Sequence, residues 1–299
     1  ALTLVAKVPS DDPVSLATAN GQHLYEREVR FYDSIAPTVT IRTPVCHHAS
    51  FDPTTGRFLL LLESLAPAAA CDQLDGLAPE RAALAVDQLA GLHAPHWGSS
   101  DLPATSFLES VADSLRPLYA ELIPVLFTGF LDRYGDALSP AARGVVEWLS
   151  PNLGAYFQGR ETPPTVTHGD YRTDNLLFDG RGGEVPLATV DWQTIGHGPG
   201  ALDLAYLLTT SLDTETRRAH ERELLDRYRS RLGELGVTGY SHDALCGDYA
   251  FYAFQGIVML VCAAVLVERT ARGDAMFLTM IERSAAAVDD LGSRRLLAA

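Results

Sequence analysis

The stretch VTHGDYRTDNLLFD, residues 166–179, constrains the fold of this chain more than any other stretch. It leads from a Thr-Val-Thr segment typical of a strand to an apolar Leu-Leu-Phe segment typical of another. Between them it places five polar side chains: His168, Asp170, Arg172, Asp174 and Asn175. Taken alone, this loop is more typical of a surface turn, because Asp, Asn and Gly favour turns and helix caps. The sequence that follows the loop favours a different interpretation.

A hairpin follows the polar loop. The apolar segments LLF (176–178) and PLATV (186–190) are separated by the glycine-rich DGRGGEV, so we expect them to pair antiparallel. In such a pair, the residue before the first strand and the residue after the second lie at the same end. These residues are Asn175 and Asp191. Their amide and carboxylate oxygens would form a site suited to Mg²⁺, with phosphate and water as the other ligands.

The same strand end lies within reach of Asp170, which directly precedes the hairpin in the loop. Phosphoryl transfer needs metal ions that neutralise phosphate charge and a carboxylate that accepts the proton of the acceptor hydroxyl. Asp170 is our candidate for that base. Arg172, two residues further on, is a candidate for a clamp on the transferring phosphoryl group. Together, the Asn and the second Asp at the hairpin end favour a site over a surface turn.

The first part of the chain contains a possible ion pair. Residues 2–8 are rich in strand formers and include Lys7, and the segment 24–35 has a helical apolar stripe that includes Glu28. An unpaired carboxylate on a buried face would be destabilising by several kcal/mol, so Glu28 needs a cation, and Lys7 is the candidate. A strand Lys paired with a helix Glu holds the lysine against nucleotide phosphates in kinases. The alternative is a solvated Lys on an edge strand and a half-exposed Glu.

The pattern changes after residue 63. Residues 57–63, RFLLLLE, are typical of a buried strand, whereas the later segments are mostly helical. We expect helices over about 79–94, 106–127, 140–157, 215–235, 249–270 and 275–291. The sequence therefore predicts an α+β protein with a small α/β lobe, residues 1–66, and a larger, mainly helical lobe, residues 67–299, that carries the catalytic hairpin. A hinge is expected near residues 63–67.

The net charge and the cysteine content limit the classes of partner and the cellular compartment that we expect. A formal net charge of −15 argues against nucleic acid and anionic membranes, because both attract basic surfaces. The four cysteines are far apart and form no C-x-x-C pair, which favours neither a disulfide framework nor a zinc site and suggests a reducing cytoplasm.

The segment 249–267 has no charge and nearly the length of a membrane span. A buried core helix is the preferred interpretation, because Gln255 and Gly256 interrupt the segment and no second one exists.

The loop and hairpin together resemble a known superfamily. HGDYRTDNLLF (168–178) and VDWQ (190–193) are similar to the catalytic loop and the metal-binding strand of the aminoglycoside phosphotransferase and choline kinase-like superfamily, small-molecule relatives of protein kinases. GPGALDLAYLL resembles the family's helix start, where Asp203 would brace the catalytic loop. REVRFY and LLLES look more like the broad branch that includes ecdysteroid-kinase-like proteins. The resemblance spans residues 7–208 and implies a two-lobed protein-kinase-like fold.

This resemblance implies roles for the loop and the hairpin. Asp170 would be the catalytic base, and Asn175 and Asp191 would be the Mg²⁺ ligands. His168 would hold the shape of the loop rather than transfer protons. Gln193 stands where relatives often have Glu, so the resemblance implies no metal role for it.

The resemblance also implies a nucleotide site between the lobes. Lys7 would contact the phosphates of ATP with Glu28 as its partner, and the backbone of Glu63 and Leu65 would meet the adenine ring. The family places a strand hairpin with a phosphate-covering loop before the lysine strand, yet only six residues precede Lys7. Either the protein lacks this cover or the sequence begins partway through the lobe. We expect the latter, because a sheet that starts at its lysine strand would leave a buried edge unpaired.

Two functions remain open at this point. The preferred one is an ATP- and Mg-dependent phosphotransferase that moves the γ-phosphate to a hydroxyl of a small molecule. The alternative is a catalytically inactive, nucleotide-binding regulator with a kinase-like fold. The sequence does not reveal the acceptor, the choice between ATP and GTP, or the oligomeric state.

Overall fold

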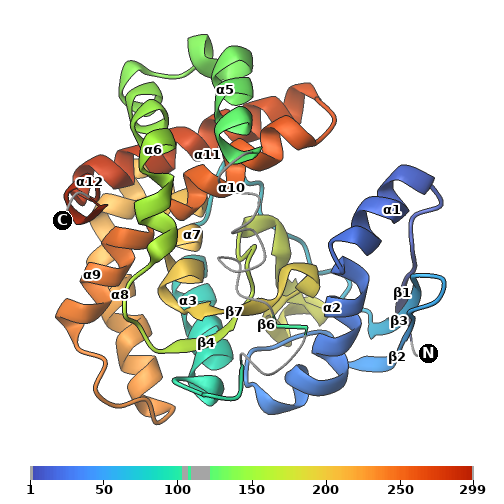
Figure 1. Ribbon diagram of the computed structural model, residues 1–299. Helices are drawn as coiled ribbons and strands as arrows, with labels where there is room; N and C mark the ends of the chain where they lie inside the picture. The colour runs from blue at the N-terminus through green and yellow to red at the C-terminus, as the bar shows by residue number, and fades with distance from the viewer. Residues whose placement is uncertain (1–2, 103–106, 109–121, 298–299) are drawn as a thin grey trace.

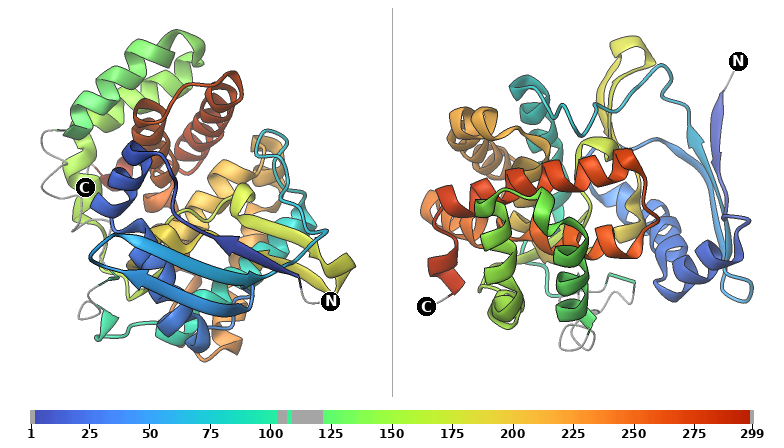
Figure 2. Two further views of the ribbon diagram at one scale, coloured as in Figure 1. Left: turned by 90° about the vertical axis from the view of Figure 1, so that its right-hand side faces the viewer. Right: turned by 90° about the horizontal axis from the view of Figure 1, so that it is seen from above.

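Three antiparallel strands form the base of the first lobe. In the computed structural model, β3 (Arg57–Glu63) lies between β1 (Leu4–Lys7) and β2 (Cys46–Asp52), and Figure 2 shows the three strands side by side. Alternate side chains of β3, among them Leu60 and Leu62, are buried, as expected for a strand with one face on a core. β2 was not predicted from the sequence.

The structure describes residues 3–102, 107–108 and 122–297. Within this part of the chain, β1 is an edge strand of its sheet. Two of its residues, Leu4 and Val5, are 37% and 51% exposed.

Two helices lie beside this small sheet, on the side that faces the rest of the chain (Figure 1). α1 (Pro13–Gly21) was not predicted, although Asp12 caps it by accepting a hydrogen bond from the Ser15 amide at 2.7 Å. α2 (Leu24–Arg30) carries Glu28 and contacts β2 and β3. The predicted helix over 24–35 ends earlier than expected as an α-helix, because residues Phe31–Ile35 form a π-helical turn. That turn directs three large side chains into the core: Phe31, Tyr32 and Ile35.

An aromatic stack joins the two lobes. The ring of Phe31, at the end of α2, lies 3.7 Å from that of Trp192 with an interplanar angle of 8°. Both side chains are fully buried. The ring of His168, in the polar loop, lies 4.6 Å from Trp192 on the helical-lobe side. The helix that carries Glu28 is therefore packed directly against the segment that follows Asp191.

The second lobe is mainly helical (Figure 1). Its helices are α3 (Pro79–His93), α5 (Leu122–Tyr134), α6 (Pro140–Gln158), α7 (Ala201–Ser211), α8 (Thr214–Glu234), α9 (His242–Tyr252), α10 (Gln255–Leu266), α11 (Ala271–Asp290) and α12 (Arg294–Leu297). The helices predicted near 79–94, 140–157, 215–235 and 275–291 are confirmed. Most of the segment predicted over 106–127 lies outside the described residues, and its end falls in α5.

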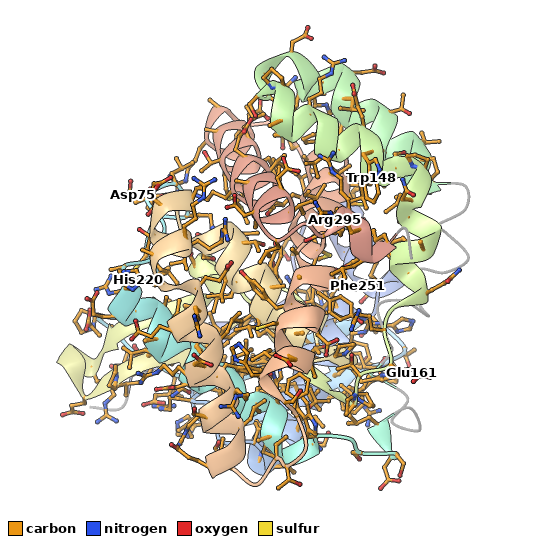
Figure 3. All side chains as sticks on the ribbon, turned by 90° about the vertical axis from the view of Figure 1, so that its left-hand side faces the viewer. Asp75, Trp148, Glu161, His220, Phe251 and Arg295 are labelled. Atoms are coloured by element: carbon orange, nitrogen blue, oxygen red, sulfur yellow. The ribbon has the colours of Figure 1, made fainter. Side chains whose placement is uncertain are left out.

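The long apolar segment is divided between two helices. The prediction of one helix over 249–270 is wrong, because α9 ends at Tyr252 and α10 begins at Gln255. By length and composition, one helical stretch in the described residues, His242–Leu266, could cross a membrane, with a mean hydropathy of 2.0. The core-helix interpretation predicts that this stretch is buried, and 72% of its apolar 18-residue window is buried inside the protein. In Figure 3, Phe251 lies within this packing, whereas Glu161 lies at the surface.

The predicted catalytic hairpin is present. β5 (Leu176–Gly180) pairs antiparallel with β6 (Val185–Thr189), with Leu176 opposite Thr189. The Val190 amide donates to the Asn175 carbonyl at 3.0 Å, so Asn175 and the residue after Val190 lie at one end of the hairpin. The Thr-Val-Thr segment forms β4 (Pro164–Thr167) as expected, but its partner strand β7 (Gly196–Pro199) was not predicted.

The aromatic stack between the lobes yields a stability prediction. Phe31→Ala should lower the free energy of unfolding by about 3–5 kcal/mol, because it removes a fully buried ring and leaves a cavity against Trp192. Val14→Ala, at a position that is 73% exposed on α1, is the control and should change this free energy by about 0.5 kcal/mol or less. Urea unfolding followed by tryptophan fluorescence measures both. Equal losses in the two variants would contradict the role of the stack.

Candidate active site

A lysine from the small lobe contacts two carboxylates. Lys7 Nζ lies 2.9 Å from Oε1 of Glu28, which is buried, and 3.0 Å from Oδ1 of Asp191. Burial alone would lower the pKa of Lys7, but the charges of Glu28 and Asp191 outweigh it and raise that pKa above its ordinary value. The predicted pair of Lys7 and Glu28 is therefore found, and the ammonium group also links the small lobe to the end of the hairpin.

A cavity of about 380 Å³ lies at this ion pair. Its lining includes all four residues predicted to contact the nucleotide and both predicted metal ligands: Lys7, Glu28, Glu63, Leu65, Asn175 and Asp191. Apolar side chains such as Ala6, Leu62 and Val190 complete the walls. The cavity thus combines an apolar part with a charged end, an arrangement typical of small-molecule sites.

A second cavity of about 620 Å³ also includes Glu63 in its lining. The Glu63 carboxylate accepts hydrogen bonds from the Arg42 guanidinium at 2.7 Å and from the Val45 amide at 3.0 Å. Against the opposing effect of burial, these contacts hold the pKa of Glu63 below its ordinary value. Sequence reasoning considered only the backbone of Glu63 and missed Val45, His47 and Arg181 of this lining.

The catalytic loop is held by a buried carboxylate on α7. Asp203 accepts hydrogen bonds from the His168 amide at 2.6 Å and the Gly169 amide at 2.9 Å. Gly169 has a φ of +83°, and a Cβ there would lie 2.5 Å from the Thr194 carbonyl oxygen, so only glycine fits. Burial opposes ionisation of Asp203, but the hydrogen bond and charge of His93, together with those of His168, hold its pKa below the ordinary value.

A buried histidine on α3 forms a hydrogen bond with the Asp203 carboxylate. His93 is fully buried, with Nε2 at 3.2 Å from Asp203 and Nδ1 at 2.6 Å from the Tyr228 hydroxyl. Because an ionised carboxylate only accepts hydrogen bonds, Nε2 of His93 carries a proton. His93 lies on the buried face of α3, and the sequence analysis gave it no role. A polar side chain at such a position is the signal that a partner must exist.

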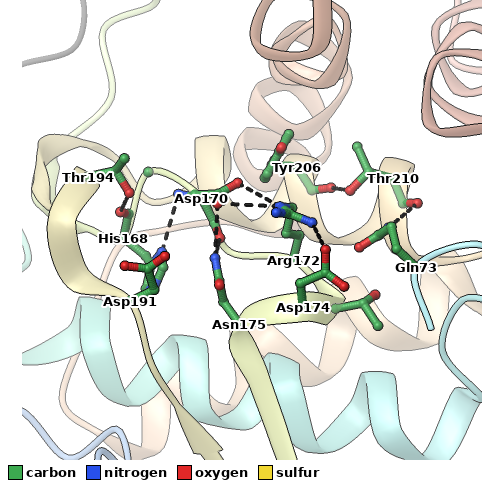
Figure 4. A network of polar contacts seen from close by, with 12 residues as sticks. Gln73, His168, Asp170, Arg172, Asp174, Asn175, Asp191, Thr194, Tyr206 and Thr210 are labelled. Atoms are coloured by element: carbon green, nitrogen blue, oxygen red, sulfur yellow. Dashed lines mark hydrogen bonds and ion pairs between the residues drawn. The ribbon is translucent and has the colours of Figure 1, made fainter. Parts of the chain in front are cut away.

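The carboxylate of Asp170 is held from two sides (Figure 4). Asn175 donates from Nδ2 to the Asp170 backbone oxygen at 2.8 Å and to Oδ2 at 3.0 Å. Arg172 donates from Nε to Oδ1 of Asp170 at 3.1 Å and also contacts Asp174. Burial, and then the negative charge of Asp170, raise the pKa of Tyr206 well above its ordinary value, so this phenol stays neutral beside the carboxylate. Tyr206 was missed by sequence reasoning.

Asp170 and Arg172 line a separate cavity of about 420 Å³ against α10 and α11. Despite burial, the charges of Asp170 and Asp174 raise the pKa of Arg172 above its ordinary value. The structure therefore places Arg172 beside Asp170, the predicted base, and in the lining of the 420 Å³ cavity. The predicted role as a phosphoryl clamp stays a prediction.

The predicted metal ligands fit a hard cation. Asn175 directs its NH₂ group to Asp170, which turns the amide oxygen away from that residue. Asp191 accepts from Lys7 through Oδ1 and from Gln193 Nε2 through Oδ2 at 3.1 Å. In the described part of the chain, no group of three or more His, Cys, Asp or Glu side chains could hold a metal ion on its own. Two protein oxygens fit Mg²⁺, which commonly takes its remaining ligands from phosphate and water.

Loss of the Asp203 charge should weaken the fold in a pH-dependent way. At pH 7, Asp203→Asn should lower the free energy of unfolding by about 1.5–3 kcal/mol, the range for hydrogen bonds to charged groups. The folded-state pKa of Asp203 is lowered, so its contribution is complete well above the unfolded value of about 3.9 and is lost as the pH falls through the folded value.

Urea titrations from neutral pH downwards measure this difference. The gap between wild type and Asp203→Asn should shrink below about pH 4. Asp243→Asn, at an exposed position, is the control and should show a small effect throughout. A gap that stays constant into the acid range would contradict the assignment.

Solved structures share this architecture. A protein of Ralstonia eutropha JMP134, provisionally classed as an aminoglycoside phosphotransferase, has a TM-score of 0.54 at 18% identity, with 97% of this chain and 87% of that chain covered. The GDP complex of aminoglycoside 2'-phosphotransferase-IIIa gives 0.54 at 16% identity, with 89% and 83% covered. The microcompartment-associated aminopropanol kinase gives 0.53 at 14% identity, with 99% and 86% covered. At these identities the likeness concerns the fold alone, and it confirms the predicted two-lobed, kinase-like fold.

Sequence comparison gives one short match and one long match. Acyl-CoA dehydrogenase family member 10 of Mus musculus is 37% identical over 67 residues, which are 22% of this chain and only 6% of that protein. The profile of the phosphotransferase enzyme family matches residues 13–240, well over half of the chain. This range contains the catalytic loop, the hairpin and the bracing Asp203. The chain belongs to the phosphotransferase enzyme family, within the superfamily that the sequence motifs resemble.

Proposed function

We propose that this protein is a small-molecule kinase that transfers the γ-phosphate of ATP to a hydroxyl group and uses Mg²⁺ as its cofactor. The supporting observation is the position of Asp170 between two cavities. Its carboxylate lines the 420 Å³ cavity, and Asn175, which is hydrogen-bonded to that carboxylate, lines the 380 Å³ cavity together with Lys7 and Asp191. An acceptor in the first cavity and a nucleotide in the second would meet at Asp170.

The nucleotide would occupy the cavity at the ion pair. Lys7 would exchange its contact with Asp191 for phosphate oxygens while it keeps its contact with Glu28. Asn175 and Asp191 would hold Mg²⁺, which neutralises phosphate charge when it is bound. The backbone of Glu63 and Leu65 would face the purine. A structural relative is a GDP complex, so we include GTP beside ATP in the tests below.

Asp170 would act as the general base. The acceptor hydroxyl gives its proton to the Asp170 carboxylate while its oxygen bonds to the γ-phosphorus, and the bond from that phosphorus to the β-phosphate oxygen breaks to release ADP. The Arg172 guanidinium, at 3.1 Å from Oδ1, would keep Asp170 ionised and oriented before transfer.

Removal of the base should abolish turnover and spare nucleotide binding. Asp170→Asn should lower kcat by about 10²-fold or more, since general base catalysis contributes roughly 10²–10⁴-fold. Asp179→Asn, at a side chain that is 70% exposed on β5, is the matched control and should leave kcat unchanged. Turnover is read as phosphate added to hydroxylated acceptors by mass spectrometry.

Calorimetric titration with Mg-ATP and with Mg-GTP completes this test. The Asp170→Asn variant should bind the nucleotide with an affinity close to that of wild type. Unchanged turnover in this variant would remove Asp170 from its role. Nucleotide binding by wild type without turnover on any acceptor would instead favour the inactive regulator.

The metal requirement should depend on Asp191. Asp191→Asn should raise the Mg²⁺ concentration for half-maximal activity by about tenfold or more, because even residues that only support metal ligands typically contribute 10–100-fold. Magnesium titrations of initial rate, with Asp179→Asn as the control, measure this shift. Full activity of wild type in excess EDTA would contradict the proposed cofactor.

A further inference from the structure

We infer that the acceptor in the 420 Å³ cavity is a neutral alcohol with an apolar body. This inference rests on the proposed function, because it assigns the substrate class of the same site. The cavity volume falls within the range of about 300–1,000 Å³ that is usual for small-molecule sites. Its walls come largely from α10 and α11, two packed neighbours in the helical lobe (Figure 1).

The wall of this cavity is apolar and adaptable. The chain has only three methionines, Met259, Met276 and Met280, and all three line the cavity. Leu260 and Phe277 lie beside them and are almost fully buried. Methionine side chains are unbranched and polarisable, so they adjust to apolar ligands of different shapes. A wall of this kind stabilises a bound molecule mainly through the apolar surface that it buries.

Some polar groups of the cavity lie close to Asp170. Asp170, Thr194 and Tyr206 belong to the lining, and the Tyr206 phenol is kept neutral next to the carboxylate. An acceptor hydroxyl would bind beside Asp170, which would take its proton. The rest of the molecule would then lie along the methionine wall.

The acids of the cavity have little capacity for a cationic acceptor. Asp274 accepts hydrogen bonds from the Arg269 guanidinium at 2.6 Å and from the Tyr134 hydroxyl at 2.6 Å, which hold its pKa below the ordinary value. Asp170 is likewise paired with Arg172. Glu268, the remaining acid of the described lining, is exposed to solvent. A polycation would have to leave water for methionine side chains without new buried carboxylates, which is unfavourable.

The methionines supply a direct test of binding that needs no turnover. Protein labelled with ¹³C at the methionine methyl groups is titrated with 1-butanol, 1-hexanol and 1-octanol, and with choline and kanamycin as cationic comparisons. Resonances are assigned with the Met276→Leu and Met280→Leu variants. We expect shifts with the linear alcohols and an affinity that rises about fourfold for each added CH₂, the value for transfer of a methylene out of water.

A pair of matched variants locates the binding. Ala263→Leu adds three carbons to a half-buried position in the cavity lining, whereas Ala275→Leu makes the same change at an exposed position on α11. The first should weaken 1-octanol binding by tenfold or more, and the second should not change it. Calorimetric titration with Mg-ATP checks that both variants keep the nucleotide site. The titration of wild type is independent of whether Ala263→Leu folds.

The outcomes separate this inference from the proposed reaction. Methyl shifts that are larger for choline or kanamycin, or an affinity that does not rise with chain length, would overturn the apolar acceptor. Phosphorylation of kanamycin in preference to the alcohols would overturn it too and leave the kinase activity intact. Binding of the alcohols with the expected dependence on chain length, but without phosphate transfer, would support the ligand class and count against the proposed reaction.

Discussion

The contact between one buried carboxylate and two backbone amides organises the centre of this protein. Asp203 fixes the positions of His168 and Gly169, and the loop after them carries Asp170 and Asn175. A hydrogen bond to an ionised acceptor is about twice as strong as one between neutral groups, so this contact can hold a loop that has little regular structure of its own. Gly169 has a positive φ, which few other residues adopt, and it lies too close to the Thr194 carbonyl for a side chain to fit. Both constraints restrict the backbone of the loop at this point.

The small lobe is attached to this centre by an aromatic contact and an ionic one. The ring of Phe31 stacks on Trp192, and the ammonium group of Lys7 contacts Asp191, the residue directly before Trp192. Both contacts converge on the short segment that follows β6. Movement of α2 would therefore displace Glu28, the other partner of Lys7, as well as the stacked ring. The small lobe therefore contacts the helical lobe through two residues that are adjacent in the sequence, Asp191 and Trp192.

Much of the site could be predicted because its residues lie at positions that local rules determine. The register of an antiparallel hairpin fixes which residues share an end, so Asn175 and Asp191 could be placed together. Glu28 could be paired with Lys7, because an acid on an apolar stripe needs a cation. Contacts that depend on packing between distant helices left no such signal. The identity of Tyr228 as a partner of His93 and the cavity between α10 and α11 belong to this class.

Regular structure was predictable to a similar degree. Long apolar or amphipathic helices such as α6 and α11 follow from periodicity. β2, β7 and α1 do not, because their sequences are short or mixed and tertiary contacts decide their conformation. The break between Tyr252 and Gln255 directly precedes the Gln255-Gly256 pair that interrupts the apolar segment, but no helix boundary was predicted from that pair.

The bridge from Lys7 to Asp191 has a consequence for the order of events in the proposed reaction. A divalent ion that approaches Asp191 on its own meets an ammonium already in place, and like charges repel. A triphosphate offers that ammonium other oxygens and so frees the carboxylate. Each ligand would then favour the binding of the other by the same factor, as thermodynamic reciprocity requires. In the proposed reaction, the site around Lys7 and Asp191 would therefore disfavour the bare cation and favour a cation that arrives already chelated.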